Sequence, residues 1–217
     1  CMVANHGSGV HQGTTDRCRP SVAAWLLSLG IACFLPHRWG YGDSPGVPWR
    51  QEVTAEPGTG AYDLQLAGRL SREADDVAAA LGFLQGVPEI VGDRVGVMGS
   101  SFGGTVSLLA ASRCAGFRCA VNFAGAAMNW DRAPALRQTM IDAALVLTQP
   151  IFLIQAANDY STAPTLELAA SLGKAGKPHQ AKIFPGFGAS HDEGHFFERL
   201  GPQVWGPDVR GFLERYL

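Results

Sequence analysis

Short apolar runs alternate with longer helical patterns along this chain, and that alternation restricts the folds open to it. The runs expected to form strands are Cys1–Asn5, Ile31–Leu35, Arg94–Met98, Arg118–Phe123, Ile151–Gln155 and Gln180–Phe184. The segments expected to form helices are Pro20–Leu29, Ala61–Gln85, Gly103–Ser112, Ala133–Leu147, Leu166–Leu172 and Asp208–Tyr216. Successive strand–helix–strand units build a parallel sheet with helices on both faces. The sequence therefore predicts an α/β fold, a three-layer α/β/α sandwich with a mostly parallel sheet.

Length and composition indicate a single domain over residues 1–217. A chain of 217 residues with 47% hydrophobic residues can bury roughly 70% of its surface when it folds. It contains no internal repeat, low-complexity tract or linker-like shift in composition. A Gly- and Pro-rich loop is expected over Pro36–Gly60, and the segment between Ala124 and Ile151 is too short for a large lid.

Charge and cysteine content limit the classes of partner. The formal net charge of −2 offers no basic surface, so we expect neither a nucleic acid nor a membrane as partner. The longest apolar runs, such as Ala115–Ala120 and Ile151–Ala157, are too short to span a bilayer. The five cysteines form no C-x-x-C pair, which favours reduced thiols and a cytoplasmic location. Either a monomer or a homodimer is compatible with the sequence.

The chain starts within an expected strand. Cys1–Ala4 is apolar and leads directly into a Gly-rich loop, with no initiator Met and no signal segment before it. We expect upstream residues to be missing from the sequence; a lipid-bearing N-terminal cysteine is the alternative.

The segment Gly99-Ser100-Ser101-Phe102-Gly103 fits the G-x-S-x-G pattern of a nucleophile elbow. It follows the expected strand Arg94–Met98 and precedes a helix of small residues. A sharp strand-to-helix turn exposes the side chain of its middle residue above the sheet. Ser101 is therefore the predicted nucleophile, beside a helix N-terminus that stabilises negative charge. Ser100 is the competing hydroxyl.

A serine hydroxyl needs a general base, and that base needs an orienting acid. In elbow-type hydrolases the acid follows the serine in the sequence, on a loop after a later strand. Asp159 comes shortly after Ile151–Gln155 and is the preferred candidate. Asp131, one strand earlier, and Asp142, inside an expected helix, are the alternatives.

Two histidines follow the last expected strand. His195, between Gly194 and Phe196, is the preferred base, and His191 is the alternative. Their i, i+4 spacing would also suit a zinc pair on a helix, but Gly194 weakens a helix and no third ligand is apparent. We expect no metal and no cofactor.

The first expected strand ends in His6-Gly7-Ser8-Gly9. A backbone N–H from this loop should form an oxyanion hole with the N–H of the residue after the nucleophile. The predicted donors are the N–H groups of Ser8 and Phe102, and His6 is expected to be a buried structural residue. Nucleotide binding is not expected, because the chain has no G-x-G-x-x-G and no Gly-Lys-Ser/Thr.

Taken together, these motifs resemble those of α/β-hydrolases, especially the dienelactone hydrolase-like and prolyl-oligopeptidase-like branch. The matching segments are Asn5–Gly9, Arg38–Ser44, Gly99–Gly104, Asn158-Asp159 and Glu193–His195. The resemblance implies a Ser101–His195–Asp159 triad and an oxyanion hole from Ser8 and Phe102. Arg38–Ser44 is expected to have a structural role, bracing the loops around the site. Dienelactone hydrolases proper use a cysteine where this chain has Ser101. The first strands of that family have no counterpart before Cys1, so the sheet is expected to lack its N-terminal edge strands.

The expected activity is hydrolysis of small carboxylic esters through an acyl-enzyme intermediate, at an open site suited to short acyl chains. The aromatic residues predicted to line the substrate pocket are Trp39, Tyr41, Phe102, Trp130, Tyr160 and Phe187. A serine peptidase or amidase acting on small peptides is one alternative. A non-catalytic binding protein with the hydrolase fold is another.

Overall fold

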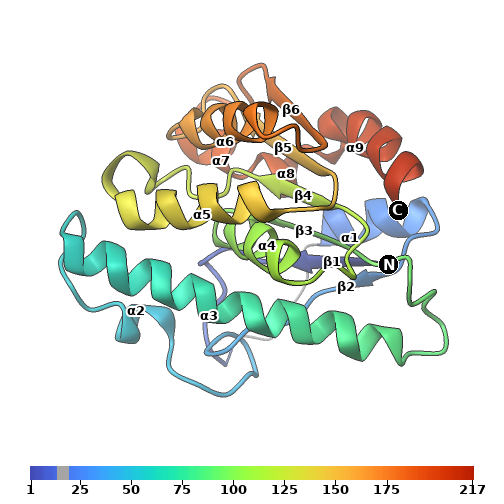
Figure 1. The fold of residues 1–217 in the computed structure, drawn as a ribbon, viewed down its shortest axis with the longest axis horizontal. Helices are drawn as coiled ribbons and strands as arrows, with labels where there is room; N and C mark the ends of the chain where they lie inside the picture. Colours follow the sequence, from blue (N-terminus) through green and yellow to red (C-terminus); the bar gives the residue numbers. More distant parts are fainter. Residues whose placement is uncertain (14–19) are drawn as a thin grey trace.

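The computed structural model describes residues 1–13 and 20–217, and its centre is a twisted parallel sheet (Figure 1). The strands are β1 (Met2–Asn5), β2 (Cys33–Phe34), β3 (Gly96–Ser100), β4 (Ala120–Phe123), β5 (Ile151–Ala156) and β6 (His179–Phe184). Within the described residues the sheet has the order β2-β1-β3-β4-β5-β6, and every neighbouring pair is parallel. The predicted α/β class and the three-layer sandwich are confirmed.

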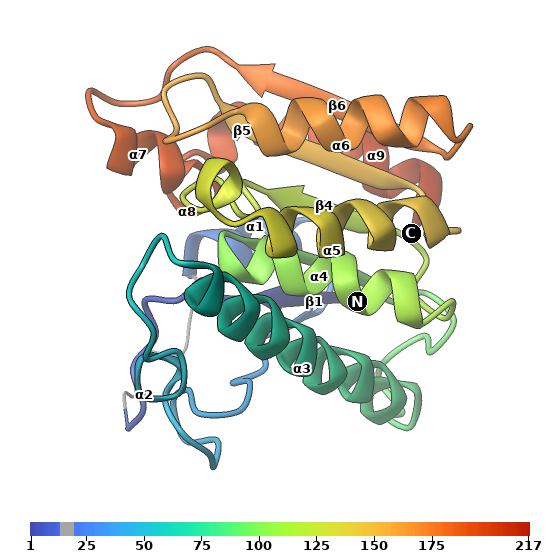
Figure 2. The same ribbon diagram turned by 60° about the vertical axis from the view of Figure 1, so that its left-hand side comes forward.

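Helices cover both faces of this sheet. They are α1 (Pro20–Ser28), α2 (Trp49–Glu52), α3 (Gly60–Gln85), α4 (Phe102–Arg113), α5 (Pro134–Val146), α6 (Ala163–Lys174), α7 (His191–His195), α8 (Phe197–Leu200) and α9 (Pro202–Tyr216). A 3₁₀ turn spans Trp130–Arg132. Helices α3 to α6 lie side by side on one face, and α1 and α9 lie on the other (Figures 1 and 2). Among the helices of the described residues, none is both long and apolar enough to cross a bilayer.

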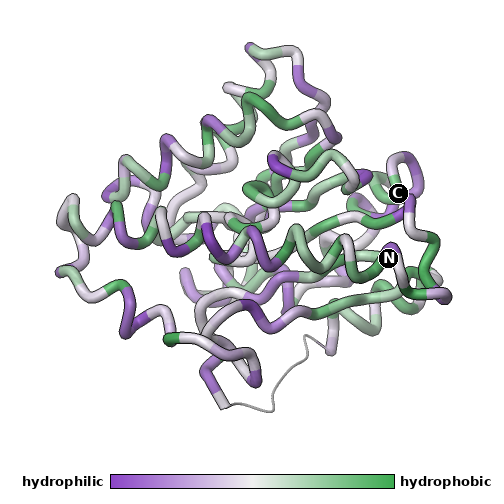
Figure 3. Tube along the Cα trace, turned by 60° about the horizontal axis from the view of Figure 1, so that its bottom comes forward, coloured by the Kyte–Doolittle hydropathy of each residue, from purple (hydrophilic) through white to green (hydrophobic). Residues whose placement is uncertain are grey.

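The four inner strands β1, β3, β4 and β5 are buried on both faces, whereas the edge strand β6 is largely exposed. Side chains alternate between the faces with a period of two. Val97 therefore packs into the core beneath α3, α4 and α5, while its neighbour Met98 packs into the core formed with α1 and α9. Outer helices such as α3, α6 and α9 are amphipathic instead, with hydrophilic and hydrophobic residues alternating along them (Figure 3). Helix α4 is buried along nearly its whole length.

The structure differs from the sequence prediction in its connections. β2 is two residues long rather than five, since only Cys33 and Phe34 pair with β1. The predicted loop over residues 36–60 contains the short helix α2. The segment after β6 contains α7 and α8, which the sequence analysis did not predict. Of the five cysteines, Cys18 lies outside the described residues, and Cys1, Cys114 and Cys119 are free thiols.

Because all the strands are parallel, their carboxyl ends lie at the same edge of the sheet. Asn5 at the end of β1 is in register with Gly99 of β3, and Ser100 is in register with Phe123 of β4. The loops that follow β1, β3, β5 and β6 therefore meet at this edge, and they carry the candidate site residues.

Candidate active site

Ser101 occupies a strained turn between β3 and α4. Its backbone has φ 59° and ψ −124°, a region that non-glycine residues rarely adopt. The turn is possible because the neighbouring chain comes very close: a Cβ on Gly99 would lie 2.5 Å from the Gly103 carbonyl, and one on Gly103 would lie 2.0 Å from the Asn5 carbonyl oxygen. Only glycine fits at these two positions, so the spacing of the motif follows from packing.

Hydrogen bonds from neighbouring strands hold the turn. The Ser101 N–H donates to the Phe123 carbonyl oxygen on β4 at 3.0 Å. The buried amide of Asn5 on β1 donates to the Met98 carbonyl oxygen at 3.3 Å and to Ser107 Oγ on α4 at 2.9 Å. Asn5 was not predicted to have a role of its own, although it precedes the His6-Gly7 loop, and the sheet register places it beside Gly99.

The structure brings Ser101, His195 and Asp159 into one hydrogen-bonded chain. His195 Nε2 lies 3.0 Å from Ser101 Oγ, and His195 Nδ1 lies 2.8 Å from Asp159 Oδ1. His195 and Asp159 are both about 95% buried, with exposures of 5% each. The Asp159 carboxylate also accepts hydrogen bonds from Gln155 Nε2 and from the Tyr160 N–H. The imidazole therefore bridges a serine hydroxyl and a buried, well-anchored carboxylate.

The alternative residues lie elsewhere. Asp131 is exposed in the 3₁₀ turn, and Asp142 is exposed on α5, where it accepts a hydrogen bond from Gln138. His191 is exposed, with its Nδ1 2.8 Å from the Asn158 carbonyl oxygen. Ser100 is buried as the last residue of β3. In the described part of the chain, no group of three His, Cys, Asp or Glu side chains is arranged to hold a metal ion.

One turn of helix, α7, carries His195 to the site. Ser190 Oγ accepts from the Glu193 N–H at 3.1 Å, and Glu193 Oε2 accepts from the Ala189 N–H at 2.7 Å. These two reciprocal hydrogen bonds cap the N-terminus of α7. These hydrogen bonds, chiefly the one from Ala189, hold the pKa of Glu193 below its usual range. The pattern Ser-x-x-Glu was available in the sequence as a helix-start signal.

Asn158 ties α7 to the loop that carries Asp159. Its side-chain Nδ2 donates to the carbonyl oxygens of Phe187 and Ser190, and its Oδ1 accepts from the Phe187 N–H. Gly194 packs directly on this side chain, since a Cβ there would lie 2.6 Å from Asn158 Oδ1. Gly194 is thus required by a close contact, even though glycine weakens the helix that contains it.

The two predicted oxyanion donors flank Ser101. Phe102 is the first residue of α4, where a backbone N–H has no partner within the helix. Gly7 packs against the serine, since a Cβ on it would lie 3.3 Å from Ser101 Cβ. Ser8 follows Gly7 and borders the cavities next to Ser101. The Trp49 indole N–H donates to the Ser8 carbonyl oxygen at 3.3 Å and so fixes this loop from α2.

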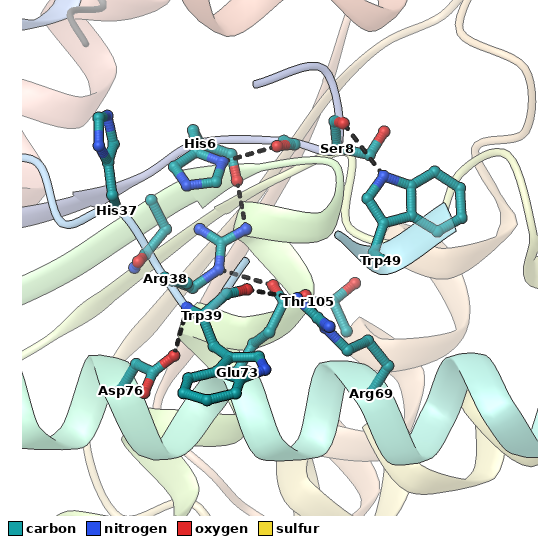
Figure 4. A network of polar contacts seen from close by, with 12 residues as sticks. His6, Ser8, His37, Arg38, Trp39, Trp49, Arg69, Glu73, Asp76 and Thr105 are labelled. Carbon is teal, nitrogen blue, oxygen red and sulfur yellow. Dashed lines mark hydrogen bonds and ion pairs between the residues drawn. The ribbon is translucent and has the colours of Figure 1, made fainter. Parts of the chain in front are cut away.

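A buried cluster of charges supports the same loop from below (Figure 4). Glu73 on α3 accepts from Arg38 Nε and from Arg69 Nε, both at 2.8 Å, and all three side chains are almost fully buried. Arg38 Nη2 donates to the His6 carbonyl oxygen at 2.9 Å. Burial, together with the nearby Glu73 carboxylate, raises the pKa of Tyr41, which packs on His6. The structure therefore assigns Arg38 and Tyr41 structural roles beneath the loop.

Two cavities meet at Ser101. The larger has a volume of about 730 Å³ and is lined by residues that include His6, Leu35, His195, Glu198 and Leu200. The smaller has a volume of about 190 Å³ and is lined by residues that include Trp49, Tyr62, Phe102, Ala126 and Arg132. Ser8, Ser101 and Met128 line both. We refer to them below as the His195 cavity and the Phe102 cavity.

Of the aromatic residues predicted to line the pocket, only Phe102 borders either cavity. Trp130 and Tyr41 are 1% exposed and belong to the interior. Phe187 packs against Phe197, and Trp39 lies over Gly46. Tyr160 lies edge-on to the His195 ring and donates to Asp192 through its hydroxyl. Trp49 and Tyr62, which do line a cavity, were missed because neither adjoins a motif or a strand end.

The fold is shared with solved hydrolase structures of low sequence identity. Est1E from Butyrivibrio proteoclasticus, solved with ferulic acid, aligns over 99% of this chain and 88% of its own with a TM-score of 0.68 and 15% identity. An esterase from Pyrococcus furiosus aligns over 99% of this chain and 81% of its own, with a TM-score of 0.68 and 16% identity. Acetyl xylan esterase from Paenibacillus sp. R4 aligns over 100% and 74%, with a TM-score of 0.63 and 18% identity.

These likenesses support the α/β-hydrolase fold. No curated protein matches the sequence. Residues 9–199 match the dienelactone hydrolase family, which covers most of the chain and every candidate residue of the triad. The chain therefore belongs to the dienelactone hydrolase family of hydrolases.

Proposed function

We propose that this protein is a serine esterase that hydrolyses small carboxylic esters through an acyl-enzyme intermediate. The observation that carries the proposal is the continuous hydrogen-bonded chain from Asp159 through His195 to Ser101, with Ser101 held in a strained elbow turn. The matched family consists of hydrolases, and two of the similar structures described above are named as esterases.

Ser101 acts as the nucleophile and His195 as the general base. The Asp159 carboxylate holds His195 in the tautomer with a proton on Nδ1, which leaves Nε2 free to accept the proton of Ser101 Oγ. As that proton moves, Oγ attacks the ester carbonyl carbon and the carbonyl oxygen becomes an oxyanion. The N–H groups of Phe102 and Ser8 bind this oxyanion, and the N-terminus of α4 adds a favourable dipole.

The tetrahedral intermediate then collapses. Protonated His195 gives its proton to the leaving alcohol, and Ser101 retains the acyl group as an ester. Water enters, loses a proton to His195 and attacks the acyl carbon. The second intermediate releases the carboxylic acid and restores the Ser101 hydroxyl.

The direct test replaces Ser101 with alanine. Ser101→Ala should lower the turnover of p-nitrophenyl acetate by about 10⁴- to 10⁶-fold, because it removes the nucleophile and leaves only binding and the oxyanion donors. The matched control is Ser112→Ala at the far end of α4, where the hydroxyl donates only to the Leu109 carbonyl oxygen. Retention of more than a few per cent of activity by a folded Ser101→Ala protein would refute the assignment.

A further inference from the structure

The position of His195 distinguishes the two cavities that meet at Ser101. His195 lines the larger cavity, whereas the smaller cavity has Phe102 on its wall and no contact with the imidazole. Under the proposed esterase mechanism, on which this assignment rests, each cavity should receive a different half of the ester.

In the tetrahedral intermediate the former carbonyl carbon carries four groups: Ser101 Oγ, the oxyanion, the leaving alkoxide oxygen and the acyl chain. The oxyanion points to the N–H groups of Phe102 and Ser8. The alkoxide oxygen must face His195 Nε2, because that nitrogen, 3.0 Å from Ser101 Oγ, returns the proton. The acyl chain takes the remaining direction, away from the imidazole.

We infer that the Phe102 cavity binds the acyl group and that the His195 cavity binds the alcohol. The shared residues Ser8, Ser101 and Met128 form the junction where the ester bond lies. This assignment makes the two halves of the substrate unequal in size, since one cavity measures about 190 Å³ and the other about 730 Å³.

The volumes indicate how much of each half of the ester the cavities can enclose. With a liquid-like volume of about 30 Å³ for each water-sized group, the 190 Å³ cavity holds on the order of six non-hydrogen atoms. By the same measure, the 730 Å³ cavity holds roughly 24. The substrate class is therefore an ester of a short carboxylic acid with a bulky alcohol.

The inner wall of the acyl cavity is built from packed aromatic rings. Trp49 packs edge-on against Phe102, with 5.1 Å between ring centroids, and its indole is held by the Ser8 carbonyl oxygen. Tyr62 is partly buried against the core beneath α3. Aromatic rings anchored in this way move little, so a chain that grows toward this inner wall has to displace packed rings. The outer rim of the cavity consists of exposed residues, which are Arg50, Pro57, Gly58, Met128 and Arg132.

The alcohol cavity is larger and also has exposed side chains on its rim. Leu200, on its wall, is 44% exposed, and Arg199 stacks on the Phe196 ring at the surface with 4.1 Å between its guanidinium carbon and the ring centroid. Side chains of this kind change rotamer readily. A range of alcohol shapes should therefore be accepted.

Two series of esters test the assignment on the unmodified protein. In p-nitrophenyl esters from acetate to dodecanoate only the acyl chain varies, and kcat/KM should fall by about tenfold or more between hexanoate and decanoate. In straight-chain alkyl acetates from ethyl to dodecyl only the alcohol varies, and kcat/KM should change by less than about threefold. Tolerance of long acyl chains combined with rejection of long alcohols would overturn the assignment.

Variants in each cavity make the test specific. Tyr62→Ala enlarges the Phe102 cavity and should move the acyl limit to longer chains without changing the alkyl acetate series. Asn129→Trp, on the same wall, should move the limit to shorter chains. Leu200→Ala enlarges the His195 cavity and is the matched control, which should leave the acyl limit in place. A shift of that limit in Leu200→Ala, with none in the other two, would contradict the assignment.

The experiments distinguish a wrong assignment of the cavities from a wrong assignment of the esterase function on which it rests. Ester hydrolysis that survives Ser101→Ala refutes the serine esterase itself. Hydrolysis that depends on Ser101 but shows the reverse size preference refutes only the assignment of the cavities.

Discussion

At the scale of single residues, the carboxylate of Asp159 is the best anchored group of the site. One oxygen accepts from the Tyr160 N–H at 2.7 Å and lies 2.8 Å from His195 Nδ1, and the other accepts from Gln155 Nε2 at 2.8 Å. A buried acceptor with three partners is held in one orientation. The orientation of the His195 ring therefore depends on Asp159.

Asp159→Asn should lower kcat for p-nitrophenyl acetate by roughly 10⁴-fold while leaving the fold intact, because an amide NH₂ facing Nδ1 favours the wrong tautomer of His195. Steady-state kinetics and circular dichroism measure the two effects. Asp131→Asn is the control, since that exposed carboxylate should contribute nothing to the rate. Equal losses in the two variants would contradict the role given to Asp159.

The sequence predicted which residues carry the chemistry of the site better than it predicted which aromatic side chains point into it. Ser101 followed from G-x-S-x-G, because the glycine spacing reflects a close approach between β3, α4 and β1. No comparable sequence pattern indicates whether an aromatic side chain points into the site or into the core. Trp130 lies in the interior, and Trp49 reaches the site from α2, since tertiary packing decides both.

At the scale of elements, the short helix α7 is held in place by its N-terminal cap and by the side chain of Asn158. It spans five residues, too few to be stable alone. The Ser190–Glu193 cap begins it, and Asn158 connects it to the Asp159 loop. In the sequence, Gly194 indicated that no helix forms here. The close contact with Asn158 that requires this glycine is a tertiary feature, which the sequence does not reveal.

Gly194→Ala should therefore impair activity more than stability. The added Cβ would lie 2.6 Å from Asn158 Oδ1 and 2.9 Å from the Asn158 backbone carbon, so α7 must shift and His195 must move with it. A displacement of about 1 Å costs on the order of 10²-fold in rate, which ester hydrolysis measures directly.

The matched control is Gly82→Ala on α3, where a Cβ meets no atom within 4 Å. It should leave the rate unchanged and stabilise the protein by about 0.5–1 kcal/mol, since alanine favours a helix. Full activity in Gly194→Ala would show that the contact with Asn158 does not position His195.

At the scale of the whole molecule, the alternation of strands and helices predicted the parallel sheet and its two helical layers. The order of strands in the sheet is a tertiary property and was not predicted. The buried cluster of Arg38, Glu73 and Arg69 was missed as well, because it joins a loop to a helix 35 residues away along the chain. Sequence patterns report local geometry, whereas such ion pairs depend on the completed fold.

The Tyr41 hydroxyl, next to this cluster, should make global stability depend on pH. Its pKa is raised in the folded state, mainly by burial and then by Glu73, so the folded protein holds this proton more tightly than the unfolded chain. The free energy of unfolding should then decrease as pH rises above about 10, the ordinary pKa of tyrosine. Tyr41→Phe keeps the ring and removes the titrating group.

Urea unfolding between about pH 8 and pH 11 tests this dependence. The decrease should be shallower in Tyr41→Phe than in the unmodified protein. Parallel pH profiles for the two proteins would mean that Tyr41 is not the group responsible.

The central claim is that His195 activates the hydroxyl of Ser101, and labelling with a fluorophosphonate probe followed by mass spectrometry tests it most directly. We predict a single adduct on Ser101 in the unmodified protein, and labelling slower by at least about tenfold in His195→Ala, because the serine then lacks its base. An adduct on another residue, or labelling of Ser101 at the same rate without His195, would contradict the claim.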